Sequence, residues 1–157
     1  MQEQKFTPQQ ALLKIKQYCA YQERCHSEVK DKLYRFGLNK NEVEDLISKL
    51  IEDNYLNEER FAIQFAGGKF RVKQWGRIKI KYQLKQKQVS EYCIKKALGA
   101  IDPADYANTL NKLAGLKLKT LKGEKNIFFR KKQLQDNLRM KGFESDLVNG
   151  LVNEIIK

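Results

Sequence analysis

The chain has 157 residues and carries 31 Lys or Arg against 19 Asp or Glu, which gives a formal net charge of +12. Hydrophobic residues make up 41% and charged residues 32%, a composition that is typical of one small globular protein and excludes a disordered chain. The excess of cations favours a polyanionic partner, and composition alone leaves DNA, RNA and an anionic membrane open.

Helix-start signals and helical periodicity run along the chain. Thr7-Pro8 followed by Gln10 predicts a capping box at the start of a first helix over residues 8–21. We expect Ser27 to cap the next helix, and Asp102-Pro103 to start another one. Apolar residues spaced three and four apart predict about nine helices, and no sustained alternation predicts a strand.

One pattern of apolar residues occurs three times, at offsets of 51 and then 54 residues. A shared helical period explains matches within each helix, but not the fixed length of the gap between the two helices of each copy. The aligned positions, which we expect to form the core and its turns, are Val29, Leu33, Gly37, Leu38, Val43, Leu46, Ile47 and Leu50; Ile80, Leu84, Gln88, Val89, Ile94, Ala97, Leu98 and Ile101; and Leu134, Leu138, Gly142, Phe143, Val148, Leu151, Val152 and Ile155.

This triplication predicts an all-helical fold, an elongated array of three tandem three-helix bundle repeats. The predicted repeats cover residues 7–56, 57–101 and 102–157. Each would begin with one further helix, over about residues 8–21, 58–73 and 103–121.

Positive charge is concentrated in the second and third predicted repeats, whereas the first is acidic, with ten acidic residues against six basic ones between Glu23 and Glu59. Eight cations and no acid occur from Lys69 to Lys87. A solvated helix face is the alternative for a lysine run, but a face without counter-charges repels itself unless a polyanion neutralises it. We therefore predict nucleic-acid contacts by Lys69, Arg71, Lys73, Trp75, Arg77, Lys79, Lys81, Lys85, Lys87, Arg130, Lys131 and Lys132.

Aromatic residues lie between these cations and could stack on exposed bases. Phe70 and Tyr82 are equally well explained as core residues. Trp75, next to Gly76, is the better candidate for a partly exposed ring.

No pattern for catalysis or for a metal site is found, so we predict neither catalytic residues nor a cofactor or metal. The single histidine, His26, follows Cys25, and adjacent residues rarely meet as a dyad. Gly67-Gly68-Lys69 lacks the spacing of a phosphate-binding loop.

The three cysteines, Cys19, Cys25 and Cys93, match no disulfide or zinc pattern, which favours a reducing compartment. No stretch is long and apolar enough to cross a membrane. We expect a soluble, cytoplasmic monomer.

Four local motifs occur in a fixed order along the chain: Arg24-Cys25-His26-Ser27, then Glu58-Glu59-Arg60-Phe61-Ala62, then Gly76-Arg77-Ile78, and finally Lys141-Gly142-Phe143. In order and spacing they resemble the RecX family of regulators of the bacterial RecA recombinase. Three positions depart from that family's pattern: Gln88 stands in place of a glycine, Phe36 in place of a lysine and Glu58 in place of an aspartate.

The resemblance implies binding to a RecA filament on single-stranded DNA, and also to double-stranded DNA, with inhibition of filament growth, ATP hydrolysis and strand exchange. We hypothesise that the basic repeats contact DNA phosphates while the acidic first repeat faces RecA. The residues expected at that protein contact are Arg24, Glu28, Asp31, Glu58, Glu59 and Arg60. A general helical DNA- or RNA-binding module and a protein adaptor with incidental lysines are the alternatives.

Overall fold

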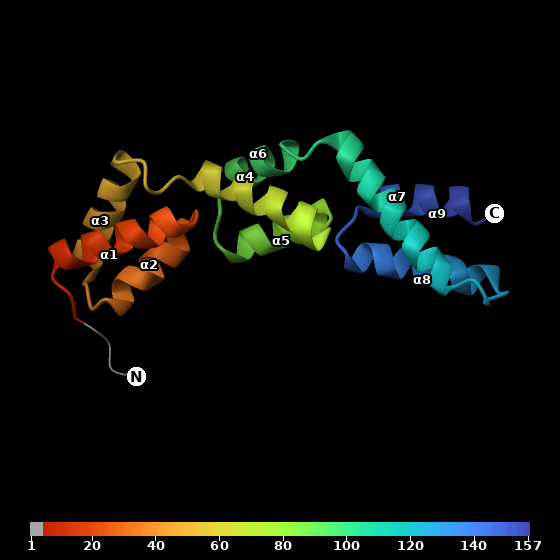
Figure 1. Ribbon diagram of the computed structural model, residues 1–157, viewed down its shortest axis with the longest axis horizontal. Coiled ribbons are helices and arrows are strands. Elements are labelled where there is room, and N and C mark those ends of the chain that lie inside the picture. Colours follow the sequence, from red (N-terminus) through yellow and green to blue (C-terminus); the bar gives the residue numbers. More distant parts are fainter. Residues whose placement is uncertain (1–4) are drawn as a thin grey trace. The chain divides into compact units, whose positions relative to one another are not determined.

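The structure, a computed structural model, describes residues 5–157 and is helical throughout, with no strand in that range (Figure 1). Nine α-helices and one π-helical turn, η1, follow one another. Their bounds are α1 Pro8–Tyr21, α2 His26–Arg35, α3 Lys40–Glu52, α4 Glu58–Gly68, η1 Lys69–Lys73, α5 Arg77–Gln86, α6 Glu91–Gly99, α7 Pro103–Thr120, α8 Ile127–Met140 and α9 Ser145–Ile155.

The chain divides into two compact units, and the division passes through α4, α5 and α6. The N-terminal unit comprises the residues up to Phe65 together with Leu84–Ala97, and the C-terminal unit comprises Ala66–Gln83 and Leu98–Lys157. Each unit therefore holds one complete predicted repeat and a share of the middle one.

In the N-terminal unit, α1, α2 and α3 contact one another in pairs (Figure 1, red to yellow). Their core contains one apolar stripe from each helix. It consists of Ala11, Ile15, Cys19, Val29, Leu33, Leu38, Val43, Leu46, Leu50 and Leu56. In the C-terminal unit, α8 contacts both α7 and α9, around the buried Leu134, Leu138 and Val148.

The first helix of each repeat is capped in the same way. The side-chain oxygens of Thr7, Asn57 and Asp102 each accept a hydrogen bond from the backbone N–H three residues later, at 3.2, 2.8 and 2.9 Å. The capping box of Thr7 and the start at Asp102-Pro103 were both predicted and are confirmed. A polar cap satisfies one of the N–H groups that a helix start leaves without a partner.

The turn after the second helix of each repeat also has one geometry. Gly37, Gln88 and Gly142 all have positive φ, at 87°, 62° and 98°. The predicted equivalence of these three positions is therefore visible in the backbone itself, and Gln88 adopts the left-handed conformation without being glycine.

The residue before each of these turns offers its carbonyl oxygen to another part of the chain. The Phe36 oxygen accepts from the Phe6 N–H at 2.9 Å, and the Lys87 oxygen accepts from the Ser27 hydroxyl at 2.9 Å. The Lys141 oxygen accepts from the Gly76 N–H at 2.8 Å. Consecutive repeats thus meet through the same acceptor, and Phe6 occupies that acceptor on the first repeat.

Two local predictions are wrong. Ser27 does not cap α2, because the chain turns helical at His26 and Glu28 closes the start by accepting from the Cys25 N–H at 3.0 Å. Ile155 is 39% exposed, whereas Ile156 is 2% exposed. The reason is that α9 ends at Ile155 and the extended backbone of Ile156 turns that side chain inward.

The all-helical fold class with its three-helix repeats is confirmed over the described residues. The predicted helix over residues 58–73 is also largely confirmed, but its last turn, η1, is π-helical.

Candidate nucleic-acid interface

The π-helical turn η1 presents two cations at the surface of the C-terminal unit. Arg71 and Lys73 both have exposed side chains. Gln74 then adopts a left-handed conformation with φ of 57°, and the Trp75 N–H donates to the Lys69 oxygen at 3.3 Å. The π-helical turn at the end of this helix therefore places two exposed cations just before the start of α5.

Two lysines lie close to the ring of Trp75. The Lys69 and Lys79 ammonium groups lie 5.1 and 4.7 Å from the centre of its ring. The side chain is half-buried, which confirms the predicted partial exposure. A ring held in this way offers one more surface to a base while its neighbouring ammonium groups can meet phosphates.

Phe70 and Tyr82 have different surroundings. Phe70 is 7% exposed and stacks on Tyr106 at 5.8 Å between ring centres, so it belongs to the core. Tyr82 is 60% exposed and remains available for contact.

Arg77, one of the cations predicted to contact nucleic acid, is engaged inside the C-terminal unit. Its guanidinium donates to the Glu144 carboxylate at 2.7 Å and lies 3.8 Å from the centre of the Tyr106 ring. The backbone N–H of Arg77 donates to the Tyr106 hydroxyl at 3.0 Å, and that hydroxyl donates to the Glu144 carboxylate. Burial is the main cause that raises the pKa of Tyr106 above its usual 10.0.

The start of α5 is fixed further by a close backbone approach. The Ile78 N–H donates to the Gly142 oxygen at 2.9 Å, and a Cβ on Gly76 would lie 2.3 Å from that same oxygen. Arg77 therefore has a structural role that the charge pattern did not indicate.

The later cations of α5 are more accessible. Lys81 is half-buried, and Lys85 is exposed and pairs with Glu91 at 3.3 Å. Lys87 lies 4.0 Å from a Glu28 oxygen, at the limit of an ion pair. Pairs with this much solvent contact contribute little to stability and leave the cations free to exchange partners.

An exposed aromatic that the sequence analysis missed precedes the basic residues of α8. Phe128 is 87% exposed at the start of α8. Arg130 is half-buried, Lys131 donates to Asn153 at 3.3 Å, and Lys132 is exposed. The available signal was the run Ile127-Phe128-Phe129 directly before three cations, since such a run at a helix start need not face the core.

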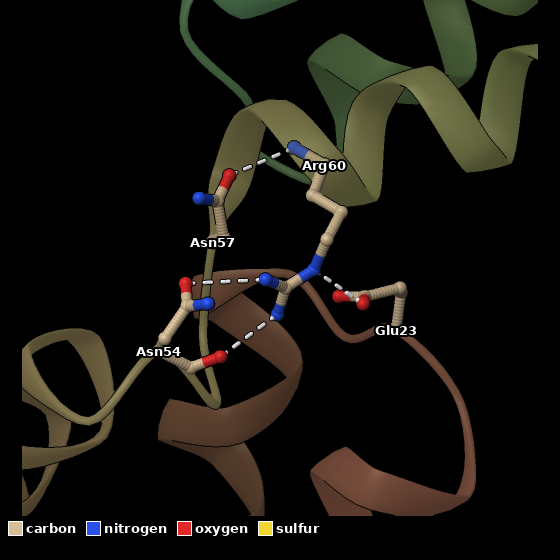
Figure 2. A network of polar contacts seen from close by, with 4 residues as sticks. All are labelled: Glu23, Asn54, Asn57 and Arg60. Atoms are coloured by element: carbon tan, nitrogen blue, oxygen red, sulfur yellow. Dashed lines mark hydrogen bonds and ion pairs between the residues drawn. The ribbon is translucent and has the colours of Figure 1, made fainter.

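Arg60, predicted at a protein contact, is the centre of a polar network in the N-terminal unit (Figure 2). Its Nε donates to Glu23 at 2.5 Å, and its two terminal nitrogens donate to the side chain and the backbone oxygen of Asn54 at 3.1 and 3.0 Å. Asn57 caps the helix by accepting from the Arg60 N–H at 2.8 Å. The guanidinium thereby ties the start of α4 to the loop after α1 and to the turn after α3.

The other residues predicted at the protein contact are divided between internal and open positions. Arg24 donates to the Tyr18 oxygen at 3.1 Å, and Glu58 accepts from the Ser90 N–H at 2.8 Å. Glu28 caps α2, Glu59 is half-buried, and Asp31 is exposed.

Two searches of the described residues bear on other kinds of site. Residues 5–157 contain no cluster of three or more His, Cys, Asp or Glu side chains arranged to hold a metal ion. None of the helices in that range combines the length and the apolar character that crossing a membrane requires.

Comparison with known proteins gives consistent matches. The model of the RecX second three-helix domain matches residues 57–98. A regulatory protein RecX from Prosthecochloris aestuarii is 32% identical over 139 residues, which cover 88% of this chain and 89% of that protein. A regulatory protein RecX from Clostridium perfringens is 34% identical over 133 residues, and the match covers 84% of this chain but only 62% of that protein.

A solved structure agrees in fold. The crystal structure of RecX from Lactobacillus salivarius superposes with a TM-score of 0.85, covering 94% of this chain and 96% of that one. Its sequence identity is 22%, so the likeness is one of architecture.

Proposed function

The chain belongs to the RecX family of regulatory proteins, and on that premise we propose that it binds RecA filaments on DNA and restrains their growth, ATP hydrolysis and strand exchange. It would do so in the cytoplasm, as a monomer and without a cofactor. The repeats over residues 7–56, 57–101 and 102–157 are the proposed structural modules.

The observation that carries the DNA part of this proposal is the surface around η1. Arg71 and Lys73 are exposed there, and two ammonium groups lie close to the Trp75 ring. Exposed cations that contact phosphates release the counterions condensed on the nucleic acid, and an aromatic ring adds stacking to single-stranded bases. Single-stranded DNA is therefore the proposed ligand, with double-stranded DNA bound through phosphates alone.

The RecA part rests on the acidic first repeat. Arg60 and Glu58 form hydrogen bonds within the chain, so we assign them the role of holding this surface in place and not that of binding RecA directly. Asp31, Glu44 and Asp45 are exposed on α2 and α3. We propose that these carboxylates face basic groups of RecA, where they would steer association.

The test is a titration of the chain into RecA hydrolysing ATP on single-stranded DNA, at two salt concentrations. We expect inhibition when the chain is present at well below one copy per RecA, and weaker inhibition at the higher salt. The variant Arg71→Gln/Lys73→Gln/Lys132→Gln should inhibit less, because three exposed cations are lost.

The control is Lys30→Gln/Arg35→Gln/Lys49→Gln, which removes the same charge from exposed positions of the first repeat. It should leave inhibition unchanged. DNA binding without any effect on hydrolysis or strand exchange would reject the regulation of RecA and support a general nucleic-acid-binding module. Inhibition without salt-sensitive DNA affinity would reject the DNA part and support an adaptor.

A further inference from the structure

A cleft of about 410 Å³ lies on the N-terminal unit, between α1, α2 and the segment that precedes α1. The backbone of Phe6 closes one side, because its N–H is bonded to Phe36 and the two rings meet edge to face at 5.2 Å. The other residues that matter for its chemistry are Lys14, Tyr18, Tyr21, Arg24 and Lys32.

Three cations are held around this cleft by aromatic rings instead of carboxylates. The Arg24 guanidinium lies 3.8 Å from the centre of the Tyr18 ring, and the Lys32 ammonium lies 5.3 Å from it. The Lys14 ammonium lies 4.9 Å from the centre of the Phe6 ring. A ring orients a cation without neutralising it, so the positive charge remains available to an anion.

The cleft is therefore more positive than the repeat that contains it. Residues 7–56 hold eight acidic and eight basic residues, yet none of the described residues that line the cleft is acidic. Cations gathered in a concave site with low-dielectric walls focus the field on what enters it. The preferred ligand is accordingly an anion.

The aromatic lining specifies the anion further. Tyr21 is 84% exposed at the end of α1 and borders the cleft, so its ring face is open to a planar group. The volume lies within the roughly 300 to 1,000 Å³ of small-ligand sites, which is enough for one nucleotide. Phosphate next to a planar aromatic base is the chemistry that lysines and an open tyrosine match together.

We propose that this cleft binds a nucleotide of a single-stranded nucleic acid, with the base against Tyr21 and the phosphate beside Lys14 and Lys32. The site goes beyond the function proposed above, in which the first repeat contacts only protein. It would give the N-terminal unit a nucleic-acid contact in addition to the one proposed on the C-terminal unit.

The test measures the anisotropy of a fluorescent oligothymidylate with the full-length chain, in the absence of RecA. The variant Lys14→Gln/Lys32→Gln should reduce the slope of log affinity against log salt by about 0.7, the contribution of the one phosphate that the two lysines contact together. Tyr21→Ala should weaken binding roughly tenfold at constant salt, as the loss of one stacking contact does.

Tyr92→Ala/Lys96→Gln is the matched control, because Tyr92 is 63% exposed, the Lys96 ammonium lies 5.6 Å from its ring centre, and neither residue lines this cleft. It should behave like the unmodified chain. An oligonucleotide with 5-iodouracil should crosslink under ultraviolet light to the peptide that contains Tyr21.

Equal losses in the control and the cleft variants, or crosslinks that all map outside α1, would overturn the site. Competition by an oligoglutamate peptide that depends on Lys14 and Lys32, with unchanged oligothymidylate affinity in the variants, would assign the cleft to an acidic protein segment and also reject the proposal. RecA regulation can fail independently, because this measurement contains no recombinase.

Discussion

The turn residues Gly37, Gln88 and Gly142 share a left-handed backbone conformation, and Gln88 is the one of the three that carries a side chain. A Cβ in that conformation costs about 1 to 2 kcal/mol relative to glycine. The Val89 N–H donates to the Leu84 oxygen at 3.1 Å across this turn, so the bonded geometry is kept despite the strain. The strain is thus compensated by the burial of Val89, which is 6% exposed.

Gln88→Gly should raise the free energy of unfolding by about 0.5 to 1 kcal/mol, because relief of the strain exceeds the added entropy of the unfolded chain. Urea denaturation of the full chain measures it. Gln86→Gly, at a helical position two residues earlier, should lower the free energy by about 1 kcal/mol. Equal destabilisation by both changes would contradict the assignment of strain.

The raised pKa of the Cys19 thiol predicts how the free energy of unfolding depends on pH. Burial, with a smaller contribution from Glu23, raises its pKa from 9.0 to about 11. The folded thiol thus keeps its proton in a range where the unfolded thiol loses it. The stabilising contribution is complete below pH 9 and is lost as the pH rises toward 11.

Cys19→Ala should show a shallower decline in the free energy of unfolding between those pH values than the unmodified chain. Denaturation at a series of pH values measures the two slopes. Some decline should remain in the variant, because burial also raises the pKa of Cys25 and Tyr106. Parallel declines in the two proteins would show that Cys19 does not contribute.

At the scale of elements, the connections between helices are held by polar groups from distant parts of the sequence. Arg60 bonds to Glu23 across 37 residues, and Arg77 bonds to Glu144 across 67. Each guanidinium fixes the start of one helix against the neighbouring repeat. Two arginines that the charge pattern assigned to external partners therefore form hydrogen bonds within the chain.

Arg60→Lys should lower the free energy of unfolding by about 1 to 2 kcal/mol, because an ammonium group cannot reach Glu23 and both oxygens of Asn54 as the planar fork does. Thermal and urea denaturation measure the loss. Lys40→Gln, which removes an exposed pair with Glu44 at 4.0 Å, should change it by no more than about 0.5 kcal/mol. Similar losses from both changes would show that the Arg60 network stabilises the fold no more than an exposed ion pair does.

How much of this could be predicted depends on the range of the interaction. Caps at Thr7 and Asp102 and the repeat of turns at Gly37, Gln88 and Gly142 follow from local spacing, and the structure has them. The pairing of Arg77 with Glu144 is not local, because neither residue has a periodic counterpart that indicates the contact. The charge pattern therefore indicates where the candidate interface lies, but it does not predict which of its residues are engaged within the chain.

The cleft on the first repeat escaped the sequence analysis for a related reason. Arg24 and Lys32 belong to a repeat in which acidic and basic residues are equal in number, so a count of charges over that repeat does not reveal them. Their approach to the Tyr18 ring depends on how α1 packs on α2. The sequence would have had to predict that packing before it could indicate the site.

At the scale of the whole molecule, the boundary between compact units does not coincide with the boundaries between repeats. The second repeat contributes residues 57–65 and Leu84–Ala97 to one unit, and Ala66–Gln83 and residues 98–101 to the other. Its turn at Lys87 is bonded to the first repeat, and its Gly76 is bonded to the third. Stability of the middle repeat is thus shared with both neighbours, as in other repeat proteins.

A fragment of residues 57–101 should therefore be largely unfolded, although the family model matches most of it. Its small core and its two lost contacts leave little to offset the conformational entropy. Far-ultraviolet circular dichroism should show little helix in that fragment and cooperative unfolding in a fragment of residues 1–101. A cooperatively folded middle fragment would contradict this sharing.

The bond between the Phe6 N–H and the Phe36 oxygen has a consequence for polymerisation. Phe36 presents the acceptor that would otherwise receive the leading edge of another module, as Lys87 and Lys141 do within the chain. Because Phe6 fills this position, the acceptor that joins consecutive repeats is already occupied on the first one. We expect that a second molecule would have to displace Phe6 before it could dock there head to tail.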